Sequence, residues 1–307
     1  MRVAVASRSF SNNKYLRQKL EKICPNVTYN NSGNTLKGED LVSFLDGHEI
    51  IIVGLEVLDS QTIKRLPNLK AIGKYGVGLD KIDILAIEKR NIYFSPIPGV
   101  NALSVAELVI FMSLHCIRNI TENTYSILSQ EWKQTPGNEL KGKTFGIIGL
   151  GNVGSELERL LSIFGVKILF YDTDRSKTSI YGERVELNYL LGNSDIVSIH
   201  IPYNEINNNF FDHKKVSQMK ESSILINTSR GGIVDENAVF SSLNKGKISN
   251  AYFDVLKTEP PEINTMFPKN FHVSKHIGGS TEECILRMGE AAIQNVTDFL
   301  RKDNHHD

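Results

Sequence analysis

The glycine-rich segment 143–154, KTFGIIGLGNVG, limits the possible fold more than any other feature of this chain. It begins with an apolar run typical of a strand, and an amphipathic pattern over residues 155–164 predicts that a helix follows. Its glycines Gly149, Gly151 and Gly154 have G-x-G-x-x-G spacing. In such a unit the first glycine permits the tight turn, the second lets the backbone approach a pyrophosphate, and the third lets helix and strand pack closely. The order of strand, turn and helix therefore predicts a dinucleotide-binding unit.

An acidic residue stands where a dinucleotide site needs one. Residues 166–172, VKILFYD, predict a second strand that ends on Asp172. A carboxylate at this place can accept hydrogen bonds from ribose hydroxyls and would repel a 2′-phosphate. Arg175 follows nearby and could bind a 2′-phosphate, but Asp174 accompanies it. We therefore expect NAD, not NADP, as the cofactor.

Length and composition are those of a globular protein with two domains. The chain has 307 residues, of which 40% are hydrophobic and 23% are charged. Its 35 basic residues balance 35 acidic ones, so no global field attracts nucleic acid or an anionic membrane. The N-terminus lacks a signal-peptide pattern, and no run approaches the roughly 18 apolar residues of a membrane span. We expect a cytoplasmic protein that binds neither nucleic acid nor membrane.

Strand-like and helix-like segments alternate, which predicts parallel sheets covered by helices. A helical pattern over residues 281–300 follows the last strand and can return to the first domain. The fold class is therefore α/β, with a doubly wound flavodoxin-like substrate domain (1–100 plus 281–307), a Rossmann cofactor domain (101–280) and an interdomain cleft. Five strands are expected in the first domain and six in the second: 2–6, 27–29, 50–53, 71–73, 92–94, 144–148, 166–171, 196–201, 224–227, 250–255 and 271–273.

Other segments carry further expectations. Residues 102–118 predict a helix that is apolar almost all round and must be buried, between domains or between subunits. The tail 301–307 has no pattern and is expected to be mobile. The three cysteines, which are expected to be small core residues, lack metal-ligand spacing, so no metal site is expected: Cys24, Cys116 and Cys284.

Three polar residues follow strands of the second domain, where ligands bind to a parallel sheet. Arg230 is followed by two glycines and precedes a helix that Asp235 is expected to cap. Glu259 lies in a loop before two prolines, and His276 lies beside two glycines. Reducing a 2-oxo acid needs a carboxylate anchor, a group that orients the proton donor, and the donor itself. Arg230, Glu259 and His276 fit these roles in that order. Taken alone, Arg230 is about equally typical of a structural salt bridge, an acid in a loop is usually a surface group, and a histidine is usually a surface or hydrogen-bonded core residue.

These motifs give the chain a resemblance to the D-isomer-specific 2-hydroxyacid dehydrogenase family, and to its D-3-phosphoglycerate dehydrogenase type in particular. The resemblance runs from about residue 70 to residue 290. It rests on six segments in fixed order: YGVGLD (75–80), NALSVAE (101–107), GLGNVG (149–154), NTSRGG (227–232), DVLKTEP (254–260) and HIGGST (276–281).

The resemblance implies a catalytic triad, two binding sites and a homodimer built on the cofactor domains. The triad is Arg230, Glu259 and His276. The substrate, a small 2-hydroxy or 2-oxo acid, is expected to bind Lys74, Tyr75, Gly76, Val77 and Arg230. NAD is expected to bind Gly149, Gly151, Asn152, Val153, Gly154, Asp172, His200, Pro202, Thr228, Ser229, Asp254, Gly278 and Gly279.

Departures from the family bear on the substrate. Phosphoglycerate dehydrogenases often have an arginine where this chain has Lys74, which keeps the charge but not the bidentate fork. The chain ends soon after its last helix, without the regulatory domain by which long relatives sense serine, so no response to serine is expected. We expect 3-phosphoglycerate first and glyoxylate or hydroxypyruvate second. Two alternatives stay open: an NAD(H)-sensing protein without activity, and oxidation of another anion such as a phosphonate.

Overall fold

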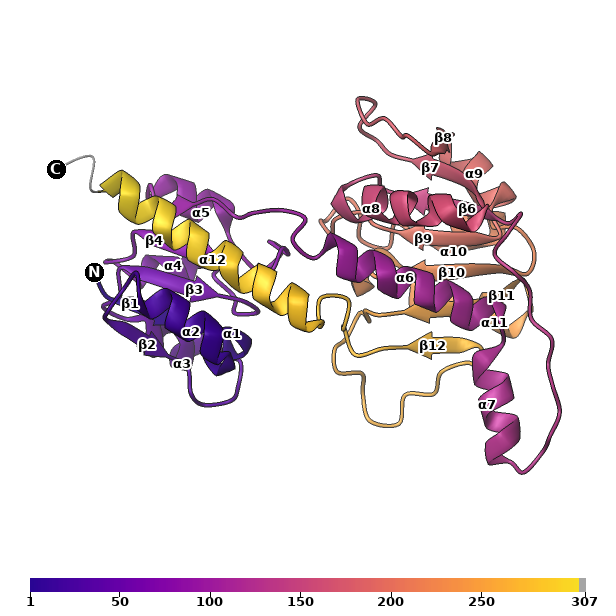
Figure 1. The fold of residues 1–307 in the computed structure, drawn as a ribbon, viewed down its shortest axis with the longest axis horizontal. Helices are drawn as coiled ribbons and strands as arrows, with labels where there is room; N and C mark the ends of the chain where they lie inside the picture. Colours follow the sequence, from indigo (N-terminus) through magenta and orange to yellow (C-terminus); the bar gives the residue numbers. More distant parts are fainter. Residues whose placement is uncertain (304–307) are drawn as a thin grey trace. The chain divides into compact units, whose positions relative to one another are not determined.

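The computed structural model describes residues 1–303, which form two compact units (Figure 1). Unit 1 comprises Met1–Asn101 with the segment that begins at Gly279, and unit 2 comprises Ala102–Gly278. Residues 304–307, which belong to the predicted first domain and to the predicted mobile tail, lie outside the described residues.

Unit 1 contains a five-stranded sheet in which every pair of neighbours is parallel. The strand order is β2-β1-β3-β4-β5, so the chain reverses direction across the sheet at β1. This is the flavodoxin-like order, and it confirms the predicted doubly wound sheet of five strands. Their bounds are β1 (Val3–Val5), β2 (Val27–Tyr29), β3 (Ile50–Val53), β4 (Ala71–Lys74) and β5 (Tyr93–Phe94).

Helices cover both faces of this sheet because successive strand residues point to opposite sides. Val3 and Val5 pack with α2 and α12, whereas Ala4 packs with α3, α4 and α5. Helix α12 passes so close to β4 that a Cβ on Gly73 would lie 2.8 Å from the backbone oxygen of Ala292. The predicted return of the last helix to the first domain is therefore confirmed. The bounds are α1 (Arg8–Asn12), α2 (Lys14–Glu21), α3 (Gly38–Leu45), α4 (Ser60–Lys64), α5 (Ile84–Lys89) and α12 (Glu282–Asp303).

The end of α12 corrects one expectation about the tail. Residues 301–303 are helical, so the expectation of a patternless, mobile segment from residue 301 is wrong for these three residues. Arg301 and Lys302 lie in the last turn, where positive charge interacts favourably with the helix dipole.

Unit 2 contains a seven-stranded parallel sheet of order β12-β11-β10-β9-β6-β7-β8. The order reverses between β6 and β9, which is the switch point where dinucleotides bind to such sheets. The six predicted strands are present. The seventh, β8, was missed because its sequence, GER, has no apolar run and is mostly exposed. The bounds are β6 (Thr144–Ile148), β7 (Lys167–Tyr171), β8 (Gly182–Arg184), β9 (Ile196–Ile199), β10 (Ser223–Asn227), β11 (Ile248–Phe253) and β12 (Phe271–Val273).

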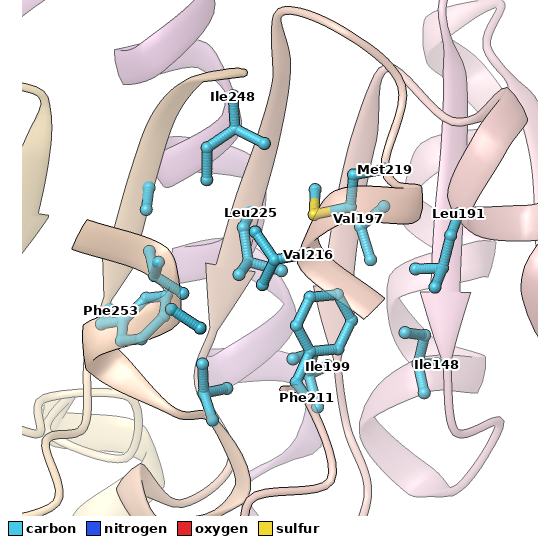
Figure 2. Packing of buried hydrophobic residues seen from close by; sticks show 14 of the residues in the cluster. Ile148, Leu191, Val197, Ile199, Phe211, Val216, Met219, Leu225, Ile248 and Phe253 are labelled. Carbon is cyan, nitrogen blue, oxygen red and sulfur yellow. The ribbon is translucent and has the colours of Figure 1, made fainter. Parts of the chain in front are cut away.

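The core of unit 2 has two halves, one on each face of the sheet. On one face α9, α10 and α11 bury a cluster that includes Val197, Phe211 and Leu225 (Figure 2). On the other face α6 and α8 pack against Phe145 and Ile147. The bounds are α6 (Ala102–Ile117), α7 (Ile120–Leu128), α8 (Asn152–Leu161), α9 (Leu187–Asn193), α10 (His213–Gln218) and α11 (Glu236–Asn244).

Helix α6 is only partly buried in the single chain, so its expected burial between domains or subunits stays a prediction. Its inner face, which includes Val109 and Met112, is completely buried, but Leu103, Phe111 and Leu114 are 38%, 52% and 36% exposed in the single chain. Helix α7 was not predicted, and none of its residues is buried in the single chain. No single helix of the described residues is long and apolar enough to cross a bilayer; α6 and α7 satisfy that criterion only as a pair bent by 60°.

The three cysteines are free and buried, as predicted for small core residues: Cys24, Cys116 and Cys284. Burial raises the pKa of the Cys24 and Cys116 thiols, so both stay protonated at neutral pH.

Candidate active site

The residues expected to bind the cofactor in unit 2 all follow the carboxyl ends of strands. Because these strands are parallel, the residues share one edge of the sheet. Of the expected cofactor residues, only Gly279 belongs to unit 1. The sets that follow β6, β7, β9, β10, β11 and β12 are, in that order, Gly149 to Gly154, Asp172, His200 with Pro202, Thr228 with Ser229, Asp254, and Gly278.

The glycine-rich turn after β6 uses its three glycines differently. Gly149 has a φ of 95°, and a Cβ there would lie 2.7 Å from the backbone oxygen of His200. A Cβ on Gly154 would lie 2.1 Å from the backbone oxygen of Gly149. These two glycines are required by the fold itself. By contrast, no atom lies within 4 Å of a Cβ built on Gly151, so the fold leaves open space beside that residue.

Helix α8 begins directly at this open space. Its N-cap is Gly151, and no side chain caps the helix. The free N–H groups of the first turn, which contains Asn152 and Val153, are therefore available to an anion. The turn fits the pyrophosphate of a dinucleotide, because it combines open space with uncapped N–H groups.

Asp172 is held next to the same turn. Its Oδ2 accepts the N–H of Leu150 at 2.7 Å, and its Oδ1 accepts the N–H of Asp174 at 2.8 Å. A carboxylate oxygen can accept two hydrogen bonds, so each oxygen can still accept one from a hydroxyl group. This arrangement suits the two hydroxyls of a ribose.

Two polar side chains lie farther along the edge. The Nε2 atom of His200 is hydrogen-bonded to Ser198 Oγ at 2.8 Å, and burial lowers the pKa of His200 to about 3, so its ring is neutral. The hydroxyl of Thr228 is buried and has no hydrogen-bond partner among the described residues. Buried hydroxyls normally have partners, so a bound ligand is a natural partner for Thr228.

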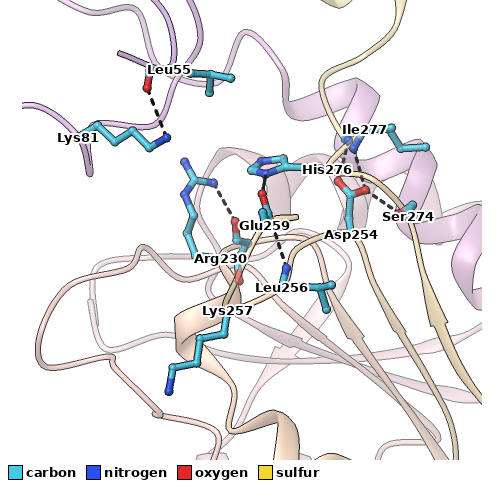
Figure 3. A network of polar contacts seen from close by, with 12 residues as sticks. Leu55, Lys81, Arg230, Asp254, Leu256, Lys257, Glu259, Ser274, His276 and Ile277 are labelled. Atoms are coloured by element: carbon cyan, nitrogen blue, oxygen red, sulfur yellow. Dashed lines mark hydrogen bonds and ion pairs between the residues drawn. The ribbon is translucent and has the colours of Figure 1, made fainter. Parts of the chain in front are cut away.

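His276 and Glu259 form a direct pair at the ends of β12 and β11 (Figure 3). His276 Nδ1 lies 2.9 Å from Glu259 Oε2, and Glu259 Oε1 accepts the N–H of Leu256 at 2.9 Å. Burial alone would raise the pKa of Glu259, but these two bonds and the charges of His276 and Arg230 hold it below its usual value. An ionised carboxylate only accepts hydrogen bonds, so Nδ1 carries the proton and Nε2 remains for a ligand.

Arg230 is placed by the glycine that follows it. A Cβ on Gly231 would lie 2.0 Å from the carbonyl carbon of Leu256, so this turn lies directly against the loop that carries Glu259. The guanidinium Nη1 donates to the backbone oxygen of Ser229 at 2.8 Å. The helix after this turn is capped by Asp235, as predicted. Arg230 therefore lies beside the His276–Glu259 pair, on the same edge (Figure 3).

Sequence reasoning missed two polar residues that brace this edge. Glu236 Oε1 accepts the N–H of Lys257 at 2.6 Å and so ties α11 to the loop of Glu259. Ser274 donates through its hydroxyl to Asp254 Oδ1 at 2.6 Å. Ser274 stands two residues before His276, and that closeness was the only signal in the sequence.

The expected substrate loop lies at the carboxyl end of β4 in unit 1. Lys74 is buried, and its ammonium donates to the backbone oxygens of Gly54 at 2.7 Å and Tyr75 at 3.0 Å. The N–H of Gly54 donates to the buried carboxylate of Glu56 at 2.6 Å. The positive side chain of Lys74 and the negative side chain of Glu56 are therefore both hydrogen-bonded to the backbone of Gly54.

The rest of this loop combines an open turn with a buried ring. Gly76 has a φ of 99°, and Val77 is half-buried. The Tyr75 hydroxyl is buried without a hydrogen-bond partner among residues 1–303, and burial, with a smaller effect of Cys284, raises its pKa to about 12. Within the same residues, no group of three or more His, Cys, Asp or Glu side chains could hold a metal ion.

Comparison with known proteins places these features in one family. The model for the NAD-binding domain of D-isomer-specific 2-hydroxyacid dehydrogenases matches residues 110–278. A hydroxypyruvate reductase of Thermotoga maritima is 34% identical over 85% of this chain and 88% of its own length. A glyoxylate reductase of Thermofilum pendens is 35% identical over 92% of this chain and 87% of its own length.

Two further proteins extend the comparison. A D-3-phosphoglycerate dehydrogenase of Methanocaldococcus jannaschii is 33% identical over 87% of this chain, but the match covers only 52% of that protein. The solved structure of an NAD-dependent formate dehydrogenase from Staphylococcus aureus, in complex with NAD, has a TM-score of 0.83 and 26% identity over 97% of this chain and 95% of that chain. The cofactor of this chain is NAD.

Proposed function

Because the chain belongs to the D-isomer-specific 2-hydroxyacid dehydrogenase family and uses NAD, we propose that Arg230, Glu259 and His276 are its catalytic residues and that it reduces a small 2-oxo acid. The observation that carries this proposal is the His276–Glu259 pair at 2.9 Å, with Arg230 on the same edge of the sheet. Unit 2 binds NAD in this proposal, and unit 1 contributes the substrate loop 74–77.

Each of the three residues has one task. Arg230 binds the substrate carboxylate through two parallel hydrogen bonds, which fixes the orientation of the adjacent carbonyl. His276 donates the proton on Nε2 to the carbonyl oxygen during reduction and takes it back during oxidation. Glu259 accepts the bond from Nδ1, which orients the ring. Bound NADH supplies the hydride.

The proposed NAD contacts follow the geometry of the carboxyl edge. The pyrophosphate binds the open turn at Gly151 and the first turn of α8, and the ribose hydroxyls bind Asp172. A 2′-phosphate would meet the Asp172 carboxylate, so kcat/KM should be much higher with NADH than with NADPH. Equal values for the two cofactors in steady-state assays would contradict this assignment, and Asp172→Ala should narrow the difference.

The substrate loop favours an acid with a single anionic group, such as hydroxypyruvate or glyoxylate. Two of the three ammonium protons of Lys74 already point to backbone oxygens, and Glu56 adds a negative charge to the same segment. A phosphate is bound best by a fork of several donors, which this lysine does not present. The relatives from Thermotoga maritima and Thermofilum pendens, named for these two substrates, match over most of their length.

3-Phosphoglycerate, the substrate expected first from the sequence, becomes the second candidate. The positive charge of Lys74 on the substrate loop and the relative from Methanocaldococcus jannaschii favour it. That relative is about twice as long as the matching region, so its activity is not carried over as a whole.

A substrate panel tests the proposal. Glyoxylate, hydroxypyruvate and phosphohydroxypyruvate are each reduced with NADH while absorbance at 340 nm is followed, and the reverse reactions are run with NAD. We expect the highest kcat/KM with hydroxypyruvate or glyoxylate. Higher kcat/KM with phosphohydroxypyruvate would favour the second candidate. NADH binding without turnover of any substrate would favour an NAD(H)-sensing protein.

We also propose that the protein is a homodimer formed through α6 and α7 and that it is cytoplasmic. A second copy would cover apolar side chains that a single chain leaves exposed. Light scattering should give twice the 34.4 kDa of one chain, and Phe111→Glu should shift the mass toward that of a monomer. A stable monomer at micromolar concentration would contradict the dimer. The exposed apolar residues are Leu103, Phe111, Leu114, Ile120, Tyr125, Ile127 and Leu128.

A further inference from the structure

We propose that Ser274 and Asp254 are positioning residues that hold His276 in the backbone conformation required for proton transfer. This inference rests on the proposed catalytic role of His276 and adds residues that act through it. The relevant segment is the His276 loop, which we define as residues 274–278. It follows β12 in unit 2.

The His276 loop contains a strained residue at its centre. His276 has a φ of 55°, which lies in the left-handed region that residues with a Cβ rarely adopt. Such a conformation persists only where the surroundings impose it, and it is common where a side chain must be aimed. The ring would otherwise lose its direction toward Glu259 when the backbone relaxes.

The backbone hydrogen bonds that hold this conformation are made to Asp254. The N–H of His276 donates to the backbone oxygen of Asp254 at 2.8 Å. The next two N–H groups donate to its carboxylate, Ile277 to Oδ1 at 2.8 Å and Gly278 to Oδ2 at 2.7 Å. Successive N–H groups that converge on one anion form a nest, so the carboxylate holds the loop in this shape.

Ser274 completes the nest from the other end of the loop. Its hydroxyl donates to Asp254 Oδ1 at 2.6 Å (Figure 3). Its N–H donates to the backbone oxygen of Phe253 at 3.0 Å. Asp254 is only 1% exposed, so water cannot easily replace a lost donor. Removing the Ser274 hydroxyl therefore leaves a buried carboxylate oxygen with one donor fewer.

The bonding of Asp254 also separates positioning from cofactor binding. Oδ1 accepts two hydrogen bonds, from Ser274 and Ile277, and is full. Oδ2 accepts one, from Gly278, and can accept another from a bound cofactor. Loss of the Ser274 hydroxyl affects Oδ1 alone, so it should disturb His276 and leave NADH affinity intact.

The test is a double-mutant cycle that combines Ser274→Ala with His276→Ala, measured on the best 2-oxo acid of the substrate panel. Ser274→Ala should lower kcat for reduction about tenfold, with the dissociation constant for NADH within twofold of wild type. Ser274→Thr keeps the hydroxyl and should restore kcat to within about threefold of wild type. In the His276→Ala background, Ser274→Ala should lower kcat no further, because the group that it positions is gone.

A matched control distinguishes positioning from general destabilisation. Ser223→Ala removes a hydroxyl that donates to the backbone oxygen of Lys220 at the amino end of β10, away from the carboxyl edge, and should leave kcat unchanged. Unchanged kcat in Ser274→Ala, or an equal loss with and without His276, would overturn the inference. Full turnover in His276→Ala would contradict the proposed function itself, and this outcome is distinct from a failure of the inference about Ser274.

Discussion

The carboxyl edges of the two sheets have similar backbones but hold their charged groups differently. The turn after β6 in unit 2 and the turn after β4 in unit 1 each contain a glycine in the left-handed region, Gly149 and Gly76. In unit 2 a helix begins at once and leaves its N–H groups open. In unit 1 the charge comes from Lys74, whose ammonium is bonded to the backbone oxygens of Tyr75 in its own loop and of Gly54 after β3.

This difference separates a general binding site from a selective one. Backbone N–H groups bind any phosphate in the same way, so the edge of unit 2 suits a cofactor common to many reactions. A site next to a buried lysine and a buried glutamate can bind ligands of only a few shapes and charges. The edge of unit 1 is therefore suited to discriminating between substrates. Changes in unit 2 should therefore affect all substrates alike, and changes in unit 1 should alter their ratio.

The largest effect is expected at His276. His276→Ala removes the proton donor, and loss of a positioned acid–base group costs about 10² to 10⁴ in rate. We expect kcat to fall by this factor for every substrate, with NADH affinity unchanged. Fluorescence titration with NADH and steady-state kinetics provide both readings. The exposed His213 is the control, because His213→Ala should leave both quantities unchanged.

The next largest effect is expected at Arg230. Arg230→Ala removes the carboxylate anchor and should lower kcat/KM about 10²-fold, because the substrate carboxylate loses a charged partner and two hydrogen bonds. Arg230→Lys keeps the charge but loses the fork, so it should recover only part of this loss. NADH should bind both variants normally. Near wild-type turnover in Arg230→Ala would show that the residue is structural.

A subtler change tests the open turn. Gly151→Ala meets no atom within 4 Å, so the melting temperature should stay unchanged. The added methyl group would nevertheless occupy space near the pyrophosphate, so the dissociation constant for NADH should rise about tenfold. Gly192→Ala in α9 is the matched control, since its nearest contact would be an ordinary 3.9 Å. Unaltered NADH affinity in Gly151→Ala would show that the pyrophosphate does not bind beside Gly151.

A pH profile tests the pair of His276 and Glu259. Because the pKa of Glu259 is held below its usual value, its carboxylate is ionised throughout the neutral range. In the wild type, kcat should fall in acid, where Glu259 is protonated and no longer accepts the Nδ1 bond of His276. Glu259→Gln has no carboxyl group to protonate, so its kcat should lack this fall and be about fivefold lower than that of the wild type at neutral pH. Glu262→Gln, in the exposed loop, should reproduce the wild-type profile.

The smallest absolute effect is expected in unit 1 and concerns selectivity. Lys74→Met should change kcat/KM for the best substrate by less than about threefold, but lower it further for phosphohydroxypyruvate, which carries more charge. The ratio of the two values is the quantity to measure. Lys81→Met, whose ammonium donates to Leu55 at 3.3 Å, is the control. An equal loss of kcat/KM for all substrates would contradict the proposal that the edge of unit 1 selects the substrate.

The sequence by itself determined the fold class, the positions of most strands along the chain and the set of chemical groups. Alternating apolar runs predicted eleven of the strands, and the G-x-G-x-x-G spacing with Asp172 predicted the cofactor site. These features are local, because hydrophobic period and glycine spacing are written in consecutive residues. The short strand β8 was missed because it has no apolar pattern. Helix α7 was missed although it carries apolar residues, and none of its residues is buried in the single chain.

Only the tertiary structure decided which of these groups are bonded to one another. Seventeen residues of sequence separate Glu259 from His276, and twenty separate Asp254 from Ser274, yet each pair is in direct contact. The structure also showed that Lys74 is bonded to the backbone oxygens of Gly54 and Tyr75 and that α6 leaves one apolar face exposed. Such contacts form where neighbouring strands end at the same edge of a sheet. No local pattern of residues predicts which side chains meet there.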